Sequence, residues 1–181
     1  MASRAPDRVV AGTDSSHQVS FELWARSANI EQNYPAWMLS YGGDGDNANF
    51  MLGQSWDDAV VRIRTIGPRT TSAGKLNEYP LEPSQIDGKI GLLPTHYVVT
   101  YSSDQVLSLY VDGGRVAEMR PDGDEDLLAP LGTWAPDFSL NVADEGSRNR
   151  PWLGIVYLMA VYEGALSYDE VHQNFAAGEL P

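Results

Sequence analysis

The sequence predicts an all-β fold, a sandwich or a barrel, and three observations support this expectation. Seventeen glycines and eleven prolines are spread along the 181 residues and divide the chain into short segments. Nine of these segments have the alternating or apolar pattern of strands. A hydrophobic content of 43% supplies a sizeable core. We expect one domain over residues 1–181, with its core at roughly 8–178.

The first predicted strand, Val19–Arg26, alternates most clearly, because Val19, Phe21 and Leu23 fall on one side and polar residues fall mainly on the other. The other eight predicted strands share short length and flanking turn residues: Ala36–Tyr41, Asn49–Gln54, Ala59–Ile66, His96–Tyr101, Val106–Val111, Arg115–Met119, Phe138–Val142 and Trp152–Tyr162. The stretch from Gly67 to Pro94 predicts a long loop with at most one short strand.

Two local signals specify how elements begin, turn and end. Asp112-Gly113-Gly114 separates two predicted strands, and Asp-Gly supplies the positive φ angles of a tight hairpin turn. Ser167 and Glu170 form the spacing of a capping box, and Gly178 is available as a stop. We therefore expect an antiparallel hairpin around Gly113 and one helix of about two turns after Ser167.

Charge and composition exclude several classes of function. With 12 Lys and Arg against 25 Asp and Glu, the net charge of −13 disfavours nucleic acid and anionic lipid as partners. The chain has no cysteine, so it has no disulfide framework and no thiolate chemistry. No apolar run is long enough for a membrane helix, and MASRAPDRVV lacks the apolar core of a secretory signal. We expect no membrane insertion.

Three motifs occur in an order that resembles a known family. VSFELWARSANI, HYVVTY followed by LSLYVDGGRV, and RPWLGIVYLMAVYEGALSYDEV are similar to the strands of bacterial laminin-G-like domains, in the concanavalin A-like lectin and glucanase superfamily. The resemblance implies a two-sheet antiparallel jelly-roll sandwich with one short C-terminal helix. It also implies a non-catalytic recognition or adhesion module of a larger exported bacterial protein, extracellular, on the cell surface or periplasmic.

Glucanases of this fold use a Glu-x-Asp-x-x-Glu strand, which places two carboxylates side by side. No Glu in this chain has Asp two positions later. The three histidines lie in unrelated segments, and His96 is expected to be a packed structural residue. We therefore expect no enzymatic activity, and a glycoside hydrolase is the least favoured alternative.

Two acidic loops suggest a calcium site by resemblance. MLSYGGDGDNANFML is similar to the pentraxin pattern in which an Asp-Asn pair binds calcium, which Asp46 and Asn47 would match. The later loop of that pattern would supply Asp144 and Glu145. Oxygen donors of this kind suit calcium. Both loops are also where turns place Asp, Asn and Gly, so the structural interpretation stays open.

Tryptophans are candidates for sugar binding, which typically uses an exposed aromatic plane beside fixed polar groups. Trp37, Trp56 and Trp134 lie near predicted strand ends and are the candidate rim platforms, although burial is the default for tryptophan. Trp24 and Trp152 lie within the family motifs and are expected in the core or on a sheet face.

The last predicted strand is apolar on both faces. Ile155 and Leu158 stand where the family pattern has glutamates, so both faces are expected to be covered. The cover is either the terminal helix or the long loop, or else a neighbouring domain or second copy of the chain. The sequence therefore predicts a module that binds glycan or protein, with a structural spacer or protein-docking domain as the alternative.

Overall fold

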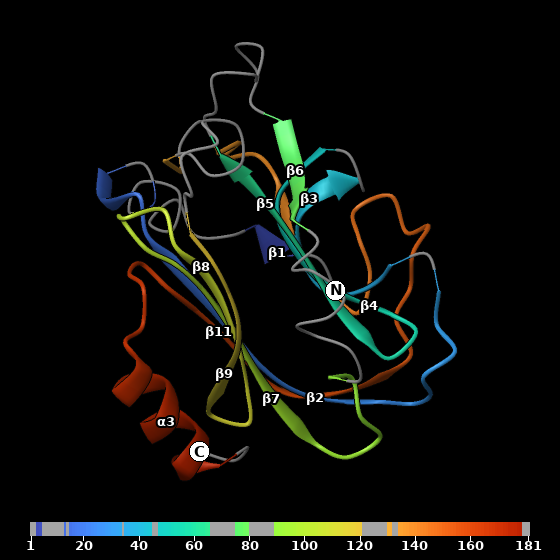
Figure 1. Cartoon of the computed structure of the whole chain (residues 1–181). Coiled ribbons are helices and arrows are strands. Elements are labelled where there is room, and N and C mark those ends of the chain that lie inside the picture. The colour runs from blue at the N-terminus through green and yellow to red at the C-terminus, as the bar shows by residue number, and fades with distance from the viewer. Residues whose placement is uncertain are drawn as a thin grey trace.

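Two antiparallel β-sheets face each other in the computed structural model, and a C-terminal helix lies outside them (Figure 1). The structure describes residues 3–4, 13, 15–33, 35–44, 47–65, 75–79, 89–120, 130–131 and 134–178. The elements in chain order are β1 (Ser3–Arg4), β2 (Val19–Ser27), β3 (Ala36–Asp44), β4 (Asn47–Ser55), β5 (Asp58–Thr65), β6 (Lys75–Tyr79), β7 (Thr95–Tyr101), β8 (Leu107–Val111), β9 (Gly114–Met119), β10 (Ser139–Val142), β11 (Gly154–Tyr162) and α3 (Tyr168–Ala177).

The strand order is β1-β10-β3-β4-β5-β6 in the six-stranded sheet and β11-β2-β7-β8-β9 in the five-stranded sheet. Every neighbouring pair is antiparallel. This arrangement confirms the predicted jelly-roll sandwich. All nine predicted strands are present, with ends shifted by at most three residues, and β6 lies within the stretch predicted as a long loop.

The core lies between the two sheets and is built from alternating inward side chains. Phe21 of β2 and Phe50 of β4 stack across it, with ring centroids 3.6 Å apart and planes 5° from parallel. Val19 and Leu23 face the same core, as the alternation of β2 predicts.

Among the described residues, no helix is long and apolar enough to cross a membrane.

The structure confirms the predicted hairpin turn at Gly113 and the predicted helix cap at Ser167. Asp112 and Gly113 have φ angles of 49° and 77° in the turn between β8 and β9. The Ser167 side chain accepts from the Glu170 backbone amide, and the Glu170 side chain accepts from the Ser167 backbone amide. Gly178, with φ 88°, ends the helix. A Cβ atom at Gly113 would lie 2.8 Å from the ring of Phe175, so the hairpin turn packs directly against α3.

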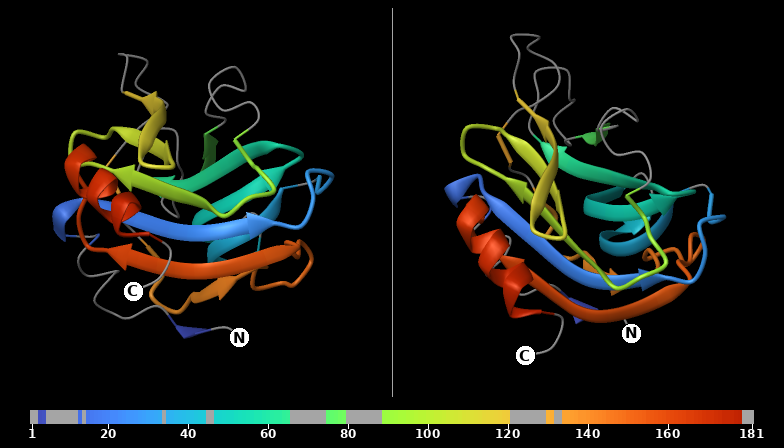
Figure 2. Two further views of the ribbon diagram at one scale, coloured as in Figure 1. Left: turned by 90° about the horizontal axis from the view of Figure 1, so that it is seen from below. Right: turned by 60° about the horizontal axis from the view of Figure 1, so that its bottom comes forward.

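Helix α3 covers the outer face of the five-stranded sheet, as the views from below show (Figure 2). Phe175 stacks on Trp24 of β2, with ring centroids 5.8 Å apart. Val171 packs with Val98 and Tyr110. This cover explains why β2, which alternates in sequence, is buried on both faces.

Helix α3 does not cover the whole of β11, the edge strand of the five-stranded sheet. Ile155 is 44% exposed and Tyr157 is 36% exposed, whereas Leu158 is half-buried. Within the part of the chain that the structure describes, α3 therefore covers only the second half of this strand, which it contacts through Asn174 and Tyr162. Cover of the first half by a neighbouring domain or a second copy of the chain, the other alternative, stays a prediction.

Candidate functional site

The five tryptophans differ sharply in exposure. Trp24 and Trp152 are buried, as predicted, but Trp37 (0% exposed) and Trp134 (3% exposed) are also buried. The prediction that Trp37 and Trp134 are rim platforms is therefore wrong. Trp56 is 52% exposed and is the one tryptophan of the five with an open ring face.

Local packing explains the two corrections. Trp37 points outward from β3, where it packs with Ala48 and Met51, and the guanidinium of Arg62 lies 5.0 Å from the centre of its ring. Trp134 points into the core, stacks on Phe21 and donates its indole N–H to a backbone carbonyl. A position near a strand end does not reveal which of these environments a side chain enters.

Trp56 occupies an unusual turn. Ser55 pairs with Asp58, so that Trp56 and Asp57 alone form the loop between β4 and β5. The φ angle of Trp56 is 58°, in the left-handed region that bulky residues rarely adopt. Such strain persists only where the surroundings hold it, and it concentrates at functional positions.

Gln54 supplies the surroundings that hold this turn. Its buried side-chain oxygen accepts from Ser27 Oγ at 2.7 Å, Gln32 Nε2 at 3.1 Å and Trp152 Nε1 at 2.8 Å. Its amide nitrogen donates to the Trp56 carbonyl at 2.6 Å. One side chain therefore links β2, the loop after it, the β4–β5 turn and the segment before β11.

Gln32 completes this arrangement from the loop between β2 and β3. Its backbone carbonyl accepts from the Trp56 N–H at 2.7 Å. Its side chain donates to the Leu153 carbonyl and accepts from the Leu153 N–H, at 3.0 and 2.6 Å. Hydrogen bonds to both the N–H and the carbonyl of Trp56 therefore fix the backbone that bears the exposed ring.

A cleft of about 440 Å³ lies at the end of the sandwich that bears this turn. We call it the rim cleft, and it is lined by Asn33, Ala36, Asn149, Arg150 and Pro151. Its size falls in the range of small-ligand sites. Asn33 directly follows Gln32, which binds the Trp56 backbone, so that the cleft and the exposed ring lie at the same end of the sandwich.

Sequence reasoning did not identify the polar residues of this end. Gln54 does carry a signal, because it follows Phe50 and Leu52 on the inward face of an alternating strand. An inward polar residue at the end of an apolar alternation needs several hydrogen-bond partners. Asn33, Asn149 and Arg150 lie in loops without any periodic pattern, so only the fold brings them together.

Of the four predicted calcium ligands, Asn47 is the first residue of β4, and Asp144 and Glu145 lie in the loop after β10. Asp46 lies outside the described residues, and Asn47 accepts from Arg64 Nη2 at 3.3 Å. Asp144 accepts from the Glu145 backbone N–H at 2.8 Å. Gly146 approaches β3 so closely that a Cβ atom there would lie 2.3 Å from the Gly43 carbonyl oxygen. The loop after β10 therefore packs against the end of β3.

The donor set meets part of what calcium needs. Glu145 is 4% exposed, and its Oε2 has no hydrogen-bond partner among the described residues, whereas Oε1 accepts from Ser147. A buried carboxylate oxygen of this kind is a fitting ligand for a hard cation. The Arg64 guanidinium already donates to Asn47 Oδ1 and would compete with calcium for this oxygen. Among the described residues no group of three acidic or histidine side chains gathers around one point.

A second polar cluster lies beneath α3. Glu22 accepts from His96 Nε2 at 2.9 Å, from Asn174 Nδ2 at 2.9 Å and from the Tyr162 hydroxyl. Burial alone would raise the pKa of the Glu22 carboxyl, but these hydrogen bonds and the Coulombic attraction of His96 outweigh it and lower the pKa. His96 is fully buried, so its prediction as a packed structural residue is confirmed.

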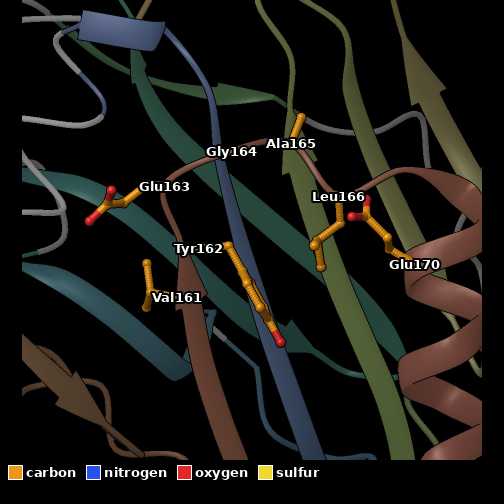
Figure 3. Close-up of a pocket in the computed structure, with 7 residues that line it drawn as sticks. All are labelled: Val161, Tyr162, Glu163, Gly164, Ala165, Leu166 and Glu170. Atoms are coloured by element: carbon orange, nitrogen blue, oxygen red, sulfur yellow. The ribbon is translucent and has the colours of Figure 1, made fainter.

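The turn between β11 and α3 forms another cleft, of about 470 Å³ (Figure 3). Glu163 and Glu170 lie on opposite sides of this turn, and the Tyr162 ring points away from Glu163. Glu170 is already used by Ser167 in the helix cap. Polar groups do not converge here, which makes the rim cleft the better candidate for a ligand site.

Comparisons with solved structures support the fold. The CBM40 domain of a Ruminococcus gnavus sialidase, bound to α2,3-sialyllactose, has TM-score 0.59 and 16% identity, over 88% of this chain and 83% of that one. Domain 4 of the Geobacillus stearothermophilus arabinanase, in complex with arabinotriose, has TM-score 0.59 and 15% identity, over 90% and 68%. A Limulus polyphemus pentraxin has TM-score 0.57 and 14% identity, over 90% and 71%.

At these identities the likeness concerns the fold alone. None of the curated proteins compared with the chain matches it. A laminin G family model, described as the concanavalin A-like lectin/glucanases superfamily, matches residues 4–172. This match spans nearly the whole of the sandwich and the first half of α3, and the chain belongs to the concanavalin A-like lectin/glucanases superfamily.

Proposed function

We propose that this chain is a non-catalytic recognition module that binds glycan at the rim, with Trp56 as the platform for a sugar ring. The observation that carries the proposal is the exposed indole of Trp56 on a strained two-residue turn, fixed by Gln32 and Gln54. A rigid aromatic face beside polar groups suits a sugar, whose ring offers C–H bonds on its faces and hydroxyls at its edge.

The environment of the buried acids supports a role without catalysis. Glycosidases need two carboxyl groups that flank a bound substrate. Glu22 is enclosed beneath α3, where Trp24 and Phe175 stack beside it. Glu145 lies at the other sheet, in the loop after β10. Two of the similar structures were solved with glycans bound, which agrees with a glycan-binding module but concerns those proteins.

The proposal is tested by a glycan array followed by calorimetric titration of the glycans that bind. Trp56→Asn removes the ring and leaves a residue that tolerates a left-handed backbone. We expect it to weaken binding at least about tenfold. Tyr168→Ala is the matched control, because it removes another exposed aromatic ring from α3. Unchanged binding by Trp56→Asn, or an equal loss in the control, would refute the assignment, and cleavage of a bound glycan would refute the non-catalytic role.

Calcium is a further part of this proposal. Glu145 Oε2 and Asp144 from the loop after β10, together with Asp46 and with Asn47 at the start of β4, would hold the ion. A ligand that binds only the folded state raises the melting temperature by mass action. We expect millimolar calcium to raise the melting temperature of the chain and to leave that of Glu145→Gln unchanged. An unshifted melt of the wild-type chain would remove calcium from the proposal.

Protein docking is the second candidate function, favoured by the exposed Ile155 and Tyr157 on an edge strand. In a larger exported protein this edge would contact a neighbouring domain or another copy of the chain. Light scattering over a range of protein concentrations tests the second copy. A mass that rises with concentration and falls back to the monomer in Ile155→Lys supports it, and a constant monomer mass excludes self-association.

A further inference from the structure

The rim cleft contains a cation that has no partner in the part of the chain that the structure describes. The Arg150 guanidinium makes no hydrogen bond or ion pair with the described residues, although the residue is half-buried. Other arginines with restricted exposure are occupied: Arg62 lies over Trp37, and Arg64 donates to the Ala48 carbonyl. A partly desolvated guanidinium left unpaired forgoes charge-assisted hydrogen bonds that the chain provides elsewhere.

The backbone of Arg150 is fixed, so its side chain projects from a defined point. The Arg150 carbonyl accepts from the Trp37 N–H at 3.2 Å, and Pro151 forms a bridge with Trp37. On the other side of the cleft, Asn33 follows Gln32, which holds the Trp56 backbone. A ligand on the Trp56 ring can therefore extend into the rim cleft.

The chemistry of the cleft selects one type of group. A guanidinium presents two parallel N–H donors that match the two oxygens of a carboxylate. The side-chain amides of Asn33 and Asn149 donate and accept, which suits hydroxyl groups. A net charge of −13 disfavours long polyanions, whereas one arginine can pair with the carboxylate of one sugar residue in a short oligosaccharide. The cleft thus combines a site for one carboxylate with sites for sugar hydroxyls.

We propose that the rim cleft binds the carboxylate of an acidic sugar, a uronic or sialic acid residue, with Arg150 as the pairing group. This inference rests on the proposed glycan-binding function and names the class of glycan. Trp56 holds a ring of the same oligosaccharide, and Asn33 and Asn149 bind hydroxyls next to the carboxylate.

Two matched pairs of probes test the carboxylate directly: trigalacturonate with its methyl ester, and 3′-sialyllactose with lactose. Each is titrated by calorimetry into the wild-type chain, Arg150→Gln, Arg150→Lys and Arg26→Gln. The last variant makes the same change in net charge at an exposed position on the outer face of β2. Circular dichroism melts of all variants check that they fold.

We expect at least one acidic probe to bind, with Arg150→Gln weakening it about 10- to 100-fold. Arg150→Lys should retain part of the affinity, because lysine keeps the positive charge but lacks the two parallel N–H donors of the guanidinium. Arg26→Gln should bind like the wild-type chain.

Three outcomes would overturn the inference. If the neutral and acidic members of a pair bind equally and Arg150→Gln has no effect, while Trp56→Asn abolishes binding, the acidic-sugar assignment fails and the glycan-binding function stands. If neither the acidic probes nor any neutral glycan binds, both fail. If hexaglutamate binds in an Arg150-dependent way and the acidic sugars do not, the site serves a protein ligand instead.

Discussion

Replacing Glu22 with glutamine should destabilise the fold by about 2 kcal/mol at pH 7. The carboxylate accepts from His96 on β7, Tyr162 on β11 and Asn174 on α3. Hydrogen bonds to a charged group exceed neutral ones by about 1 kcal/mol each, which gives an upper limit of about 3 kcal/mol for three bonds. Tyr162 and Asn174 are half-buried and recover part of this through water, whereas His96 is fully buried and cannot.

The pH dependence of this effect has a definite sign. The folded-state pKa of Glu22 lies below its ordinary value of 4.5, so the unfolded chain binds more protons between these two values. The stabilisation is therefore present above about pH 4.5 and is lost as the pH falls through the folded pKa. Glu22→Gln lacks this titration, so that the difference between the two proteins should shrink on acidification.

Urea unfolding, followed by tryptophan fluorescence at pH 7 and at successively lower pH, measures this difference. Glu118→Gln is the matched control, because Glu118 pairs with the exposed side chains of Arg115 and Arg120. Surface pairs of this kind contribute about 1 kcal/mol or less. The reasoning is refuted if Glu22→Gln costs no more than the control, or if its cost is the same at every pH.

Three further predictions concern other parts of the sandwich. Burial raises the pKa of Tyr97 to about 12, and burial together with Glu22 raises the pKa of Tyr162 to about 12. Both tyrosines therefore stabilise the folded state below pH 10, and this stabilisation is lost as the pH rises to 12. For the buried Tyr97 the loss is at most about 3 kcal/mol, and Tyr97→Phe should flatten the alkaline decline in urea unfolding. Gly113→Ala should cost more than about 1 kcal/mol, because φ is 77° and the methyl group would meet α3, and a melt with no shift would contradict this. Gln54→Leu should destabilise by about 1–3 kcal/mol or more, since Trp152 Nε1 loses its buried acceptor, and wild-type stability would contradict the role of Gln54.

The sequence predicted the elements whose causes are local. The Asp-Gly turn at Gly113 and the cap at Ser167 each depend on residues within a few positions of one another. The alternation of Val19, Phe21 and Leu23 identified the inward face of β2. Such signals survive folding because backbone conformation and strand periodicity are properties of the segment itself.

The candidate site was predictable only in part, because it depends on contacts between distant segments. Trp56 was one of three candidate platforms, and nothing local distinguishes it from Trp37 and Trp134, which other strands bury. Gln32 and Gln54 meet across the end of the sandwich, and Arg150 joins them from a loop about 100 residues further along. Glu22 and His96, which are 74 residues apart, pair only because β2 and β7 are neighbours.

The most direct measurement uses the indole N–H signals of ¹⁵N-labelled tryptophan, recorded while trigalacturonate or 3′-sialyllactose is added. The chain has five tryptophans, and Trp56→Asn identifies the signal of the exposed ring. Binding at the rim predicts that the Trp56 signal shifts with saturation while the Trp24 signal, beneath α3, stays in place. Saturable binding that moves Trp24 and leaves Trp56 unchanged would place the ligand elsewhere and contradict the account.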